Sequence, residues 1–322
     1  SAPRTGAMTG FLIAISSSAS FALSGIFASA LMSAGWSAGA AATARICFSA
    51  LVLLVPTVLL LRGSWGRVRA AWGPVLLFGM LAVFGCQLAF FLAVQFIPPS
   101  LALLIEFMGP VLVMLWMWLR TRIAPSWLTL LGAAIAVLGL VAVSGVVAGV
   151  ALHPLGVFFA LIAAVGNAAF FVAGASSHHG IPPLPFVGLG LIVAAVALTI
   201  VSATGLLPFA VTASPARIAG VEVPPALVVA GMVLISTVAA YVLGVMASRR
   251  LGATVASFTG YAEPLFGILW TILLLATLPT ALQWFGAALI IAGVVTVKVG
   301  ELVRARRRGI SEVSAAPGSA AR

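Results

Sequence analysis

Residues 106–116 read Glu-Phe-Met-Gly-Pro-Val-Leu-Val-Met-Leu-Trp, and residues 260–270 read Gly-Tyr-Ala-Glu-Pro-Leu-Phe-Gly-Ile-Leu-Trp. The two stretches lie 154 positions apart, and the same offset, with no gap, relates five pairs of residues: Pro110 and Pro264, Trp116 and Trp270, Pro125 and Pro279, Gly132 and Gly286, and Gly139 and Gly293. Each copy lies within runs of apolar residues long enough to cross a bilayer, which is the pattern of a duplicated membrane bundle.

The composition of the chain indicates that lipid, and not water, is its main solvent. Of 322 residues, 63% are apolar and 7% are charged, whereas a soluble domain carries about 25% charged residues. Stretches of about 20 apolar residues, enough to span about 30 Å of hydrocarbon as a helix, recur along the chain. Ten such spans are predicted: 8–32, 38–61, 72–95, 100–119, 125–148, 154–175, 183–205, 225–248, 253–276 and 280–299. We therefore predict an all-α polytopic membrane protein with ten transmembrane helices.

The ten spans divide into two repeats of five helices. The first repeat is predicted over residues 8–148 and the second over 154–299. Because five is an odd number, the second repeat enters the membrane from the opposite face, which makes the pair an inverted repeat. Residues 300–322 form a basic tail that we expect to be disordered and cytoplasmic.

The net charge of +11 is an orientation signal. Most of the 16 basic residues fall in segments that a ten-span topology places on one face: Arg4, Arg62, Arg67, Arg69, Arg120, Arg122, Arg249, Arg250, Lys298, Arg304, Arg306, Arg307, Arg308 and Arg322. By the positive-inside rule both termini are cytoplasmic, in a multi-pass protein of the cytoplasmic (inner) membrane. Nucleic-acid binding is not expected, because the aromatic residues lie within spans and not among the arginines.

Two of the five glutamates, Glu106 and Glu263, lie inside spans near the repeated prolines, and the chain contains no aspartate. A charge at the bilayer centre costs about 2.5–3.5 kcal/mol, so these side chains need a partner, a proton or a water-lined cavity. Pro110 and Pro264 are predicted hinges, since a proline inside a helix frees the carbonyl one turn earlier, here that of Glu106 or Gly260. Each kink either faces a cavity, where the carbonyl is satisfied, or only fits neighbouring helices.

Counting residues inward from the span ends places Arg45, Gln87 and Glu106 at one depth in the outer third of the membrane. One hypothesis is a substrate-binding or gating cluster, in which the carboxylate of a zwitterion meets Arg45 and its ammonium meets Glu106. The alternative is a permanent pair of Arg45 and Glu106 that only pins the helices. The sequence leaves both open.

A second polar level is predicted nearer the middle of the membrane. It comprises Asn167, Tyr241, Tyr261 and Glu263. Tyr241 is the counterpart of Gln87 at the repeat offset, so both are expected to project toward the repeat axis. Glu263 either changes its protonation during coupling or stays neutral and structural.

Motifs of other classes are absent from the sequence. There is no Walker loop, HExxH or GxSxG, so neither an ATP-driven pump nor an intramembrane hydrolase is expected. The histidines have no acidic or cysteine partner at ligand spacing, and we therefore predict no metal, no cofactor and no enzyme activity. The paired glycines at positions 132, 139, 286 and 293 predict close helix packing or the seam of a homodimer.

Residues 95–110, Gln-Phe-Ile-Pro-Pro-Ser-Leu-Ala-Leu-Leu-Ile-Glu-Phe-Met-Gly-Pro, resemble the fourth-span region of the EamA family in the drug/metabolite transporter superfamily. They are especially similar to its amino-acid exporters of the threonine/homoserine type, which carry a comparable Glu-Phe-x-Gly-Pro. Residues 261–264, Tyr-Ala-Glu-Pro, and 283–286, Gln-Trp-Phe-Gly, resemble the second repeat of the family, and Arg45 lies where the family often has an arginine. Residues 274–277, Leu-Leu-Ala-Thr, depart from the family's usual Gly-Glu, so no role of that glutamate is carried over.

The resemblance implies a secondary transporter that exports a small metabolite, most simply an amino acid or a related compound, by alternating access. Its expected partners are the small-molecule substrate, membrane lipids and protons as the coupling ion. Two alternatives remain: a broad-specificity drug exporter with a wider cavity that uses Phe90, Phe91 and Trp116, or a structural or lipid-handling protein in which Arg45 and Glu106 are locked together. Substrate identity, direction, coupling ion and oligomeric state are not determined by the sequence.

Overall fold

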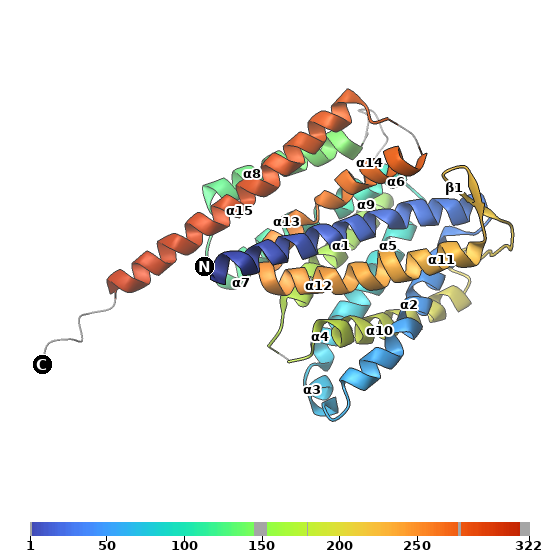
Figure 1. Cartoon of the computed structure of the whole chain (residues 1–322), viewed down its shortest axis with the longest axis horizontal. Helices are drawn as coiled ribbons and strands as arrows, with labels where there is room; N and C mark the ends of the chain where they lie inside the picture. The colour runs from blue at the N-terminus through green and yellow to red at the C-terminus, as the bar shows by residue number, and fades with distance from the viewer. Residues whose placement is uncertain (1, 145–152, 179, 276–277, 316–322) are drawn as a thin grey trace, which may run out of the picture.

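The structure is a computed structural model that describes residues 2–144, 153–178, 180–275 and 278–315. The first half of the chain forms helices and one π-helical segment, η1: α1 (Ala2–Ser33), α2 (Ala38–Leu60), α3 (Trp65–Ala70), α4 (Trp72–Leu77), η1 (Phe78–Gly85), α5 (Cys86–Ala93), α6 (Pro99–Glu106), α7 (Gly109–Thr121) and α8 (Trp127–Ser144). The second half contains α9 (Pro154–Ala175), α10 (Pro183–Ala203), β1 (Ala216–Ile218), β2 (Val221–Val223), α11 (Pro225–Val233), the π-helical η2 (Leu234–Ala239), α12 (Ala240–Leu251), α13 (Ala253–Thr259), α14 (Ala262–Leu275) and α15 (Ala281–Ala315). Figure 1 shows these helices as one elongated bundle.

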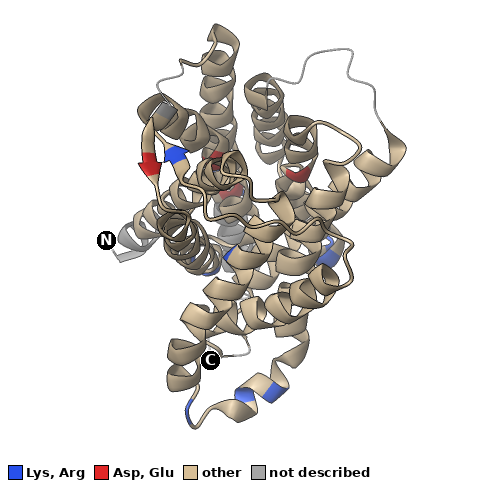
Figure 2. Ribbon diagram, turned by 90° about the vertical axis from the view of Figure 1, so that its right-hand side faces the viewer, with Lys and Arg blue, Asp and Glu red and all other residues tan. Residues whose placement is uncertain are grey.

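Within the described residues, nine helices are long and apolar enough to cross a membrane. They correspond to nine of the ten predicted spans, and the chain is an all-α polytopic membrane protein. The remaining span, predicted over 253–276, is divided into α13 and α14 at Gly260 and Tyr261. In Figure 2 few positions of the ribbon are coloured as charged residues.

The two kinked spans break one turn before their prolines. The fourth span is interrupted at Phe107 and Met108, between α6 and α7. Val111 donates its N–H to the Met108 carbonyl instead of continuing the α-helical pattern, which leaves the Phe107 carbonyl to accept the Tyr261 hydroxyl at 2.7 Å. A carbonyl released at the break before Pro110 is thus satisfied by the other repeat.

The prediction of a free carbonyl at Gly260 is wrong, because this carbonyl accepts the Glu263 N–H at 2.9 Å. For Glu106 the free carbonyl stays a prediction, and the structure adds the Phe107 carbonyl, which is bonded across the repeats. In both spans the helix reforms with a tight turn after the break, so which carbonyl is released depends on how the chain winds there.

Helices α8 and α15 cross antiparallel and lie side by side along one edge of the bundle (Figure 1). A Cβ atom on Gly139 would lie 2.7 Å from the Gly286 carbonyl oxygen, and one on Gly286 would lie 2.7 Å from the Gly139 oxygen. Gly132 approaches Gly293 in the same way, again at 2.7 Å. Since Gly132 and Gly139 are the repeat counterparts of Gly286 and Gly293, exchanging the repeats maps this contact onto itself. Such an exchange of antiparallel helices requires a twofold axis in the membrane plane, as an inverted repeat predicts.

The same contacts explain the use of the small residues. Their faces pack within one chain, so a homodimer would need another surface. Helix α15 also continues to Ala315, beyond residue 300, where the sequence places the start of a disordered tail. Its charged side chains are themselves good helix formers, and the rest of the predicted tail, residues 316–322, lies outside the described residues.

Arg249 fastens the end of α12 to the segment that joins α9 and α10. Its Nη1 donates to the Ile181 carbonyl at 2.8 Å, its Nε donates to the Gly174 carbonyl at 3.4 Å, and its guanidinium lies 5.5 Å from the centre of the Phe186 ring. Because hydrogen bonds to charged groups contribute about 1.5–3 kcal/mol, we expect Arg249→Ala to lower the free energy of unfolding by about that amount.

The measurement is thermal unfolding of the purified protein. Arg250→Ala is the matched control, because Arg250 is the exposed neighbour on the same helix. Equal melting temperatures for the two variants would contradict a stabilising role of Arg249.

Candidate functional site

A cavity of about 530 Å³ lies at the centre of the bundle, between helices of both repeats. One end is lined by Ala247 and Ala256, and at the other end it reaches Met32, Ala38 and Pro99. These last residues are at the ends of α1, α2 and α6. They lie opposite the helix ends and loops that carry most of the arginines. In the orientation expected from the basic residues, the cavity therefore extends toward the outer face. We refer to it as the central cavity.

Six of the seven residues predicted to line a substrate pathway are on the wall of the central cavity: Arg45, Gln87, Glu106, Asn167, Tyr241 and Glu263. The predicted hinge Pro264 is on the wall as well. Tyr261 is not: it is fully buried between the repeats, against Phe258 and Phe107. Pro110 is buried and also lies off the wall.

The π-helical segments direct Gln87 and Tyr241 into this site. Segments η1 and η2 fall at equivalent positions of the two repeats, and each ends two residues before Gln87 or Tyr241, respectively. A π-turn inserts an extra residue and rotates the helix that follows it. In η2 the hydroxyls of Ser236 and Thr237 both donate to the Met232 carbonyl at 2.9 Å. These hydrogen bonds satisfy a backbone carbonyl at the point where the helical winding changes.

Residues equivalent in the two repeats meet in the middle of the protein. The Tyr241 side chain interacts with that of Gln87, its counterpart, and with that of Arg45. Tyr261 and Phe107, also counterparts, form the hydrogen bond described above. Two equivalent residues can touch only near the axis that relates them, so these contacts place the repeat axis through the central cavity and its wall.

Arg45 is the one basic side chain among the described residues of this wall. It is close enough to both Glu106 and Glu263 to interact with their charges. In the described part of the chain, however, the ion pairs within 4.0 Å are Arg217–Glu222 and Arg304–Glu301. The buried Nε of Arg45 has no hydrogen-bond partner in the structure. The locked pair of Arg45 and Glu106 is therefore not formed in this conformation.

Glu106 instead accepts a weak hydrogen bond from Cys86, whose Sγ lies 3.4 Å from Oε1 and 3.4 Å from the Ala163 carbonyl. Cys86 could not be selected from the sequence, because its partner Glu106 is 20 positions away on another helix. Asn167 packs its Oδ1 against Gly109, where any larger side chain would collide with it. Within the described ranges, no group of three His, Cys, Asp or Glu side chains is arranged to hold a metal ion.

The rest of the wall consists mostly of small alanine, serine and glycine residues, together with several phenylalanines. Phe21, Phe90, Phe91, Phe170 and Phe171 line it. Ser17, also on the wall, donates its hydroxyl to the Ala240 carbonyl at 2.7 Å and so joins α1 to α12. Trp116, expected in a wider drug-exporting cavity, lies elsewhere and is 48% exposed.

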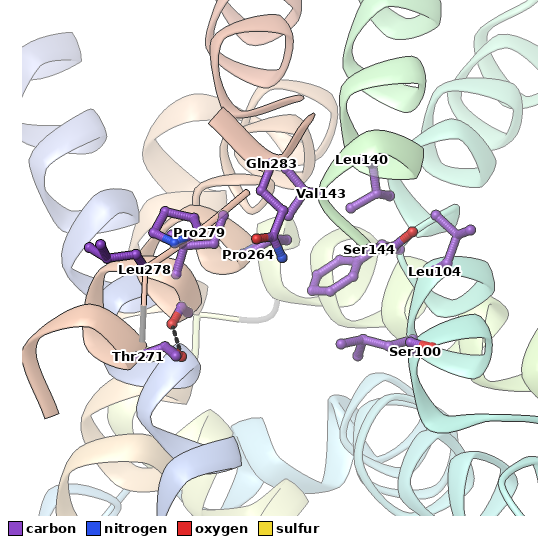
Figure 3. Close-up of a pocket in the computed structure, with 14 residues that line it drawn as sticks. Ser100, Leu104, Leu140, Val143, Ser144, Pro264, Thr271, Leu278, Pro279 and Gln283 are labelled. Atoms are coloured by element: carbon purple, nitrogen blue, oxygen red, sulfur yellow. Dashed lines mark hydrogen bonds between the residues drawn. The ribbon is translucent and has the colours of Figure 1, made fainter. Parts of the chain in front are cut away.

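A second cavity, of about 340 Å³, lies beside the first, among α6, α8, α14 and α15. Figure 3 shows its wall, with Leu104 and Ser100 on one side, Leu140 and Val143 above, and Pro264, Thr271 and Leu278 opposite. The wall is mostly apolar. We call this space the lateral chamber.

The EamA-like transporter family matches residues 8–145 and 154–299, which together make up most of the chain. The chain belongs to the EamA-like transporter family. The family therefore makes this protein a membrane transporter, and its two matched segments fall on the two predicted repeats. Residues 276 and 277, part of the stretch that departs from the family pattern, lie outside the described residues.

Solved structures agree with this EamA-like fold. One of them, described only as the crystal structure of a protein, has a TM-score of 0.72 and 19% sequence identity, and the match covers 90% of this chain and 98% of that one. At this identity the likeness shows the fold alone. No curated protein matches the chain. The family match does not single out exporters of the threonine/homoserine type.

Proposed function

We propose that this protein is a secondary transporter that exports a small zwitterionic metabolite, most simply an amino acid, across the cytoplasmic membrane. The observation that carries the proposal is Arg45, a guanidinium on the wall of the central cavity with no ion pair and with its Nε unpartnered. A guanidinium matches a carboxylate with two parallel hydrogen bonds. Glu106 and Glu263 face the same space and supply acceptors for an ammonium group.

Alternating access follows from the inverted repeats. Two halves related by an axis in the membrane plane can exchange conformations, so that a site on the axis opens to one side and then to the other. The breaks before Pro110 and Pro264 give each half a place to flex. In the orientation that we propose, both termini are cytoplasmic and the central cavity is open toward the outside.

Protons are the coupling ion that we propose. On the described wall of the central cavity, two carboxylates face a single arginine, so one of them can lose its proton when the ammonium of the substrate arrives and regain it after release. Glu106 and Glu263 are the candidates for this exchange.

The proposal is tested by counterflow. Liposomes that contain the purified protein are loaded with one unlabelled amino acid and are expected to accumulate the labelled form of the same amino acid. The assay is repeated over a panel of amino acids with small, apolar and aromatic side chains. If no member of the panel is exchanged and cationic dyes are exported, the result would instead support the drug exporter. Phe90 and Phe91 on the cavity wall are the observation that favours this alternative.

Glu106→Gln tests the ammonium partner. The amide keeps a hydrogen-bond acceptor but loses the charge, and hydrogen bonds to charged groups are about twice as strong as neutral ones. We expect about a tenfold loss of amino-acid affinity with normal expression, measured by counterflow at graded concentrations. Unchanged exchange would make Glu106 a structural residue.

A further inference from the structure

The central cavity and the lateral chamber share part of their walls. Leu103, Phe107, Pro264 and Gly267 belong to both. The two spaces are therefore neighbours, divided only by side chains of α6 and α14 and by the residues next to the two helix breaks. One is charged and aromatic, and the other is nearly all hydrocarbon.

The lateral chamber exists because the α8–α15 pair packs on the rest of the bundle along only part of its length. Where the pair does pack on the bundle, a buried hydrophobic core is formed by Phe107, Leu140, Phe258, Tyr261 and Ile290. Nearer the outer end, α14 is tied to α1, with Trp270 Nε1 donating to the Ala19 carbonyl at 2.9 Å. This contact holds α14 toward α1 on the side away from α15, and the chamber fills the space between α14 and the pair.

Three polar side chains of the chamber are hydrogen-bonded to groups close to them in the chain. The Ser144 hydroxyl donates to the Val141 carbonyl at 2.8 Å, and the Thr271 hydroxyl donates to the Gly267 carbonyl at 2.8 Å (Figure 3). Gln283 accepts the Thr280 N–H at 2.9 Å. Because most of the wall is apolar and these hydroxyls and the Gln283 oxygen have partners, it favours hydrocarbon over a polar ligand.

Gly267 stands at the boundary between the two spaces. It lines both of them, and no heavy atom lies within 4 Å of the position that a Cβ atom would take there. We take this open space beside a helical glycine on the shared wall as the passage for a chain of methylene groups. A larger side chain at this position would enter the passage without a collision at Cβ.

We infer that the lateral chamber receives the apolar tail of the transported molecule, while its zwitterionic head stays at Arg45 and the carboxylates. The inference deepens the proposed function and rests on it. The substrate class is then an amphipathic zwitterion with an extended unbranched side chain. The favoured occupant is the tail of the substrate and not a lipid chain, because the chamber adjoins a charged cavity that can hold the head of the same molecule.

The experiment measures binding to the full-length protein in lipid nanodiscs by calorimetry. The probes form a straight-chain series: alanine, norvaline, norleucine and α-aminooctanoate. Burial of each added methylene is expected to tighten binding about fourfold, hence about 60-fold from alanine to norleucine. In Gly267→Leu the dependence on chain length is expected to disappear beyond norvaline, with alanine as the reference for each variant.

The matched control is Gly73→Leu, since Gly73 is also a helical glycine with nothing within 4 Å of its Cβ position and lines neither cavity. It should keep the wild-type dependence, and circular dichroism and thermal unfolding confirm that both variants are folded. A dependence that survives Gly267→Leu would place the tail in the central cavity and overturn the inference. No dependence in the wild type, with lipid that co-purifies and is lost in Gly267→Leu, would assign the chamber to a lipid and overturn it as well. Failure of every zwitterion to bind, alanine included, would instead overturn the proposed function and the inference with it.

Discussion

Arg45→Gln is expected to weaken the binding of a zwitterionic amino acid by about 10- to 150-fold, the equivalent of about 1.5–3 kcal/mol for a hydrogen bond to a charged group. Arg45 is the single cation on the described wall of the central cavity, so no second positive charge there can take over the substrate carboxylate. Without it, Glu106 and Glu263 also leave the cavity with unbalanced negative charge. Counterflow of amino acids should fall below detection, while the affinity for cationic compounds should not decrease.

Two further variants separate charge from geometry. Arg45→Lys keeps the positive charge but loses the planar fork that binds a carboxylate with two hydrogen bonds, so we expect intermediate affinity. Arg250→Gln removes a charge from an exposed position and should leave affinity unchanged. If Arg45→Gln binds amino acids as tightly as the wild type, Arg45 serves only the structure and the zwitterion hypothesis fails.

The fold could be predicted because its two main signals are long in sequence. Apolar stretches of about 20 residues specify membrane helices, and the offset of 154 that links Pro110 to Pro264 specifies the repeat. Two spans were not predicted as they occur: the fourth is interrupted at Phe107 and Met108, and the one over 253–276 at Gly260 and Tyr261. The proline signalled a kink there, but a full break also depends on the contact that Tyr261 makes with the other repeat.

The site could be predicted in depth but not in direction. Counting residues from a span end gives the height of a side chain in the membrane, and this count brought Arg45, Gln87 and Glu106 to one wall. It does not give the angle around the helix axis. Tyr261 was expected on the wall for its height, yet the break before it turns the ring into the core. Cys86 follows a π-helical segment, and such a segment has no residue signature in the sequence.

The repeat offset held more information than the depth count used. Gln87 with Tyr241 and Phe107 with Tyr261 are equivalent pairs, and both pairs are in contact. In an inverted repeat, an equivalent pair that meets marks the axis, and the axis is where the two halves can build one shared site. Searching aligned repeats for polar counterparts in mid-span therefore indicates a site, although it cannot tell which pairs will touch.

The crossing of α8 and α15 predicts the largest loss of stability. A Cβ on Gly286 would lie 2.7 Å from the Gly139 oxygen and 2.8 Å from the Ala142 Cβ, distances that no pair of packed atoms sustains. We expect Gly286→Val to force the two helices apart and to cost about 3 kcal/mol or more, the upper end of what overpacking costs in a core. Thermal unfolding of the purified protein measures the loss.

Gly25→Val is the matched control, because Gly25 is a helical glycine of α1 with nothing within 4 Å of its Cβ position. Its melting temperature should stay near that of the wild type, and Gly139→Val, on the opposite side of the crossing, should behave like Gly286→Val. The double variant Gly139→Val with Gly286→Val should cost less than the sum of the single changes, since the first substitution has already separated the helices at the same contact. Full additivity, or a stable Gly286→Val, would show that the glycines do not hold the crossing and would remove the packing evidence for the axis between the repeats.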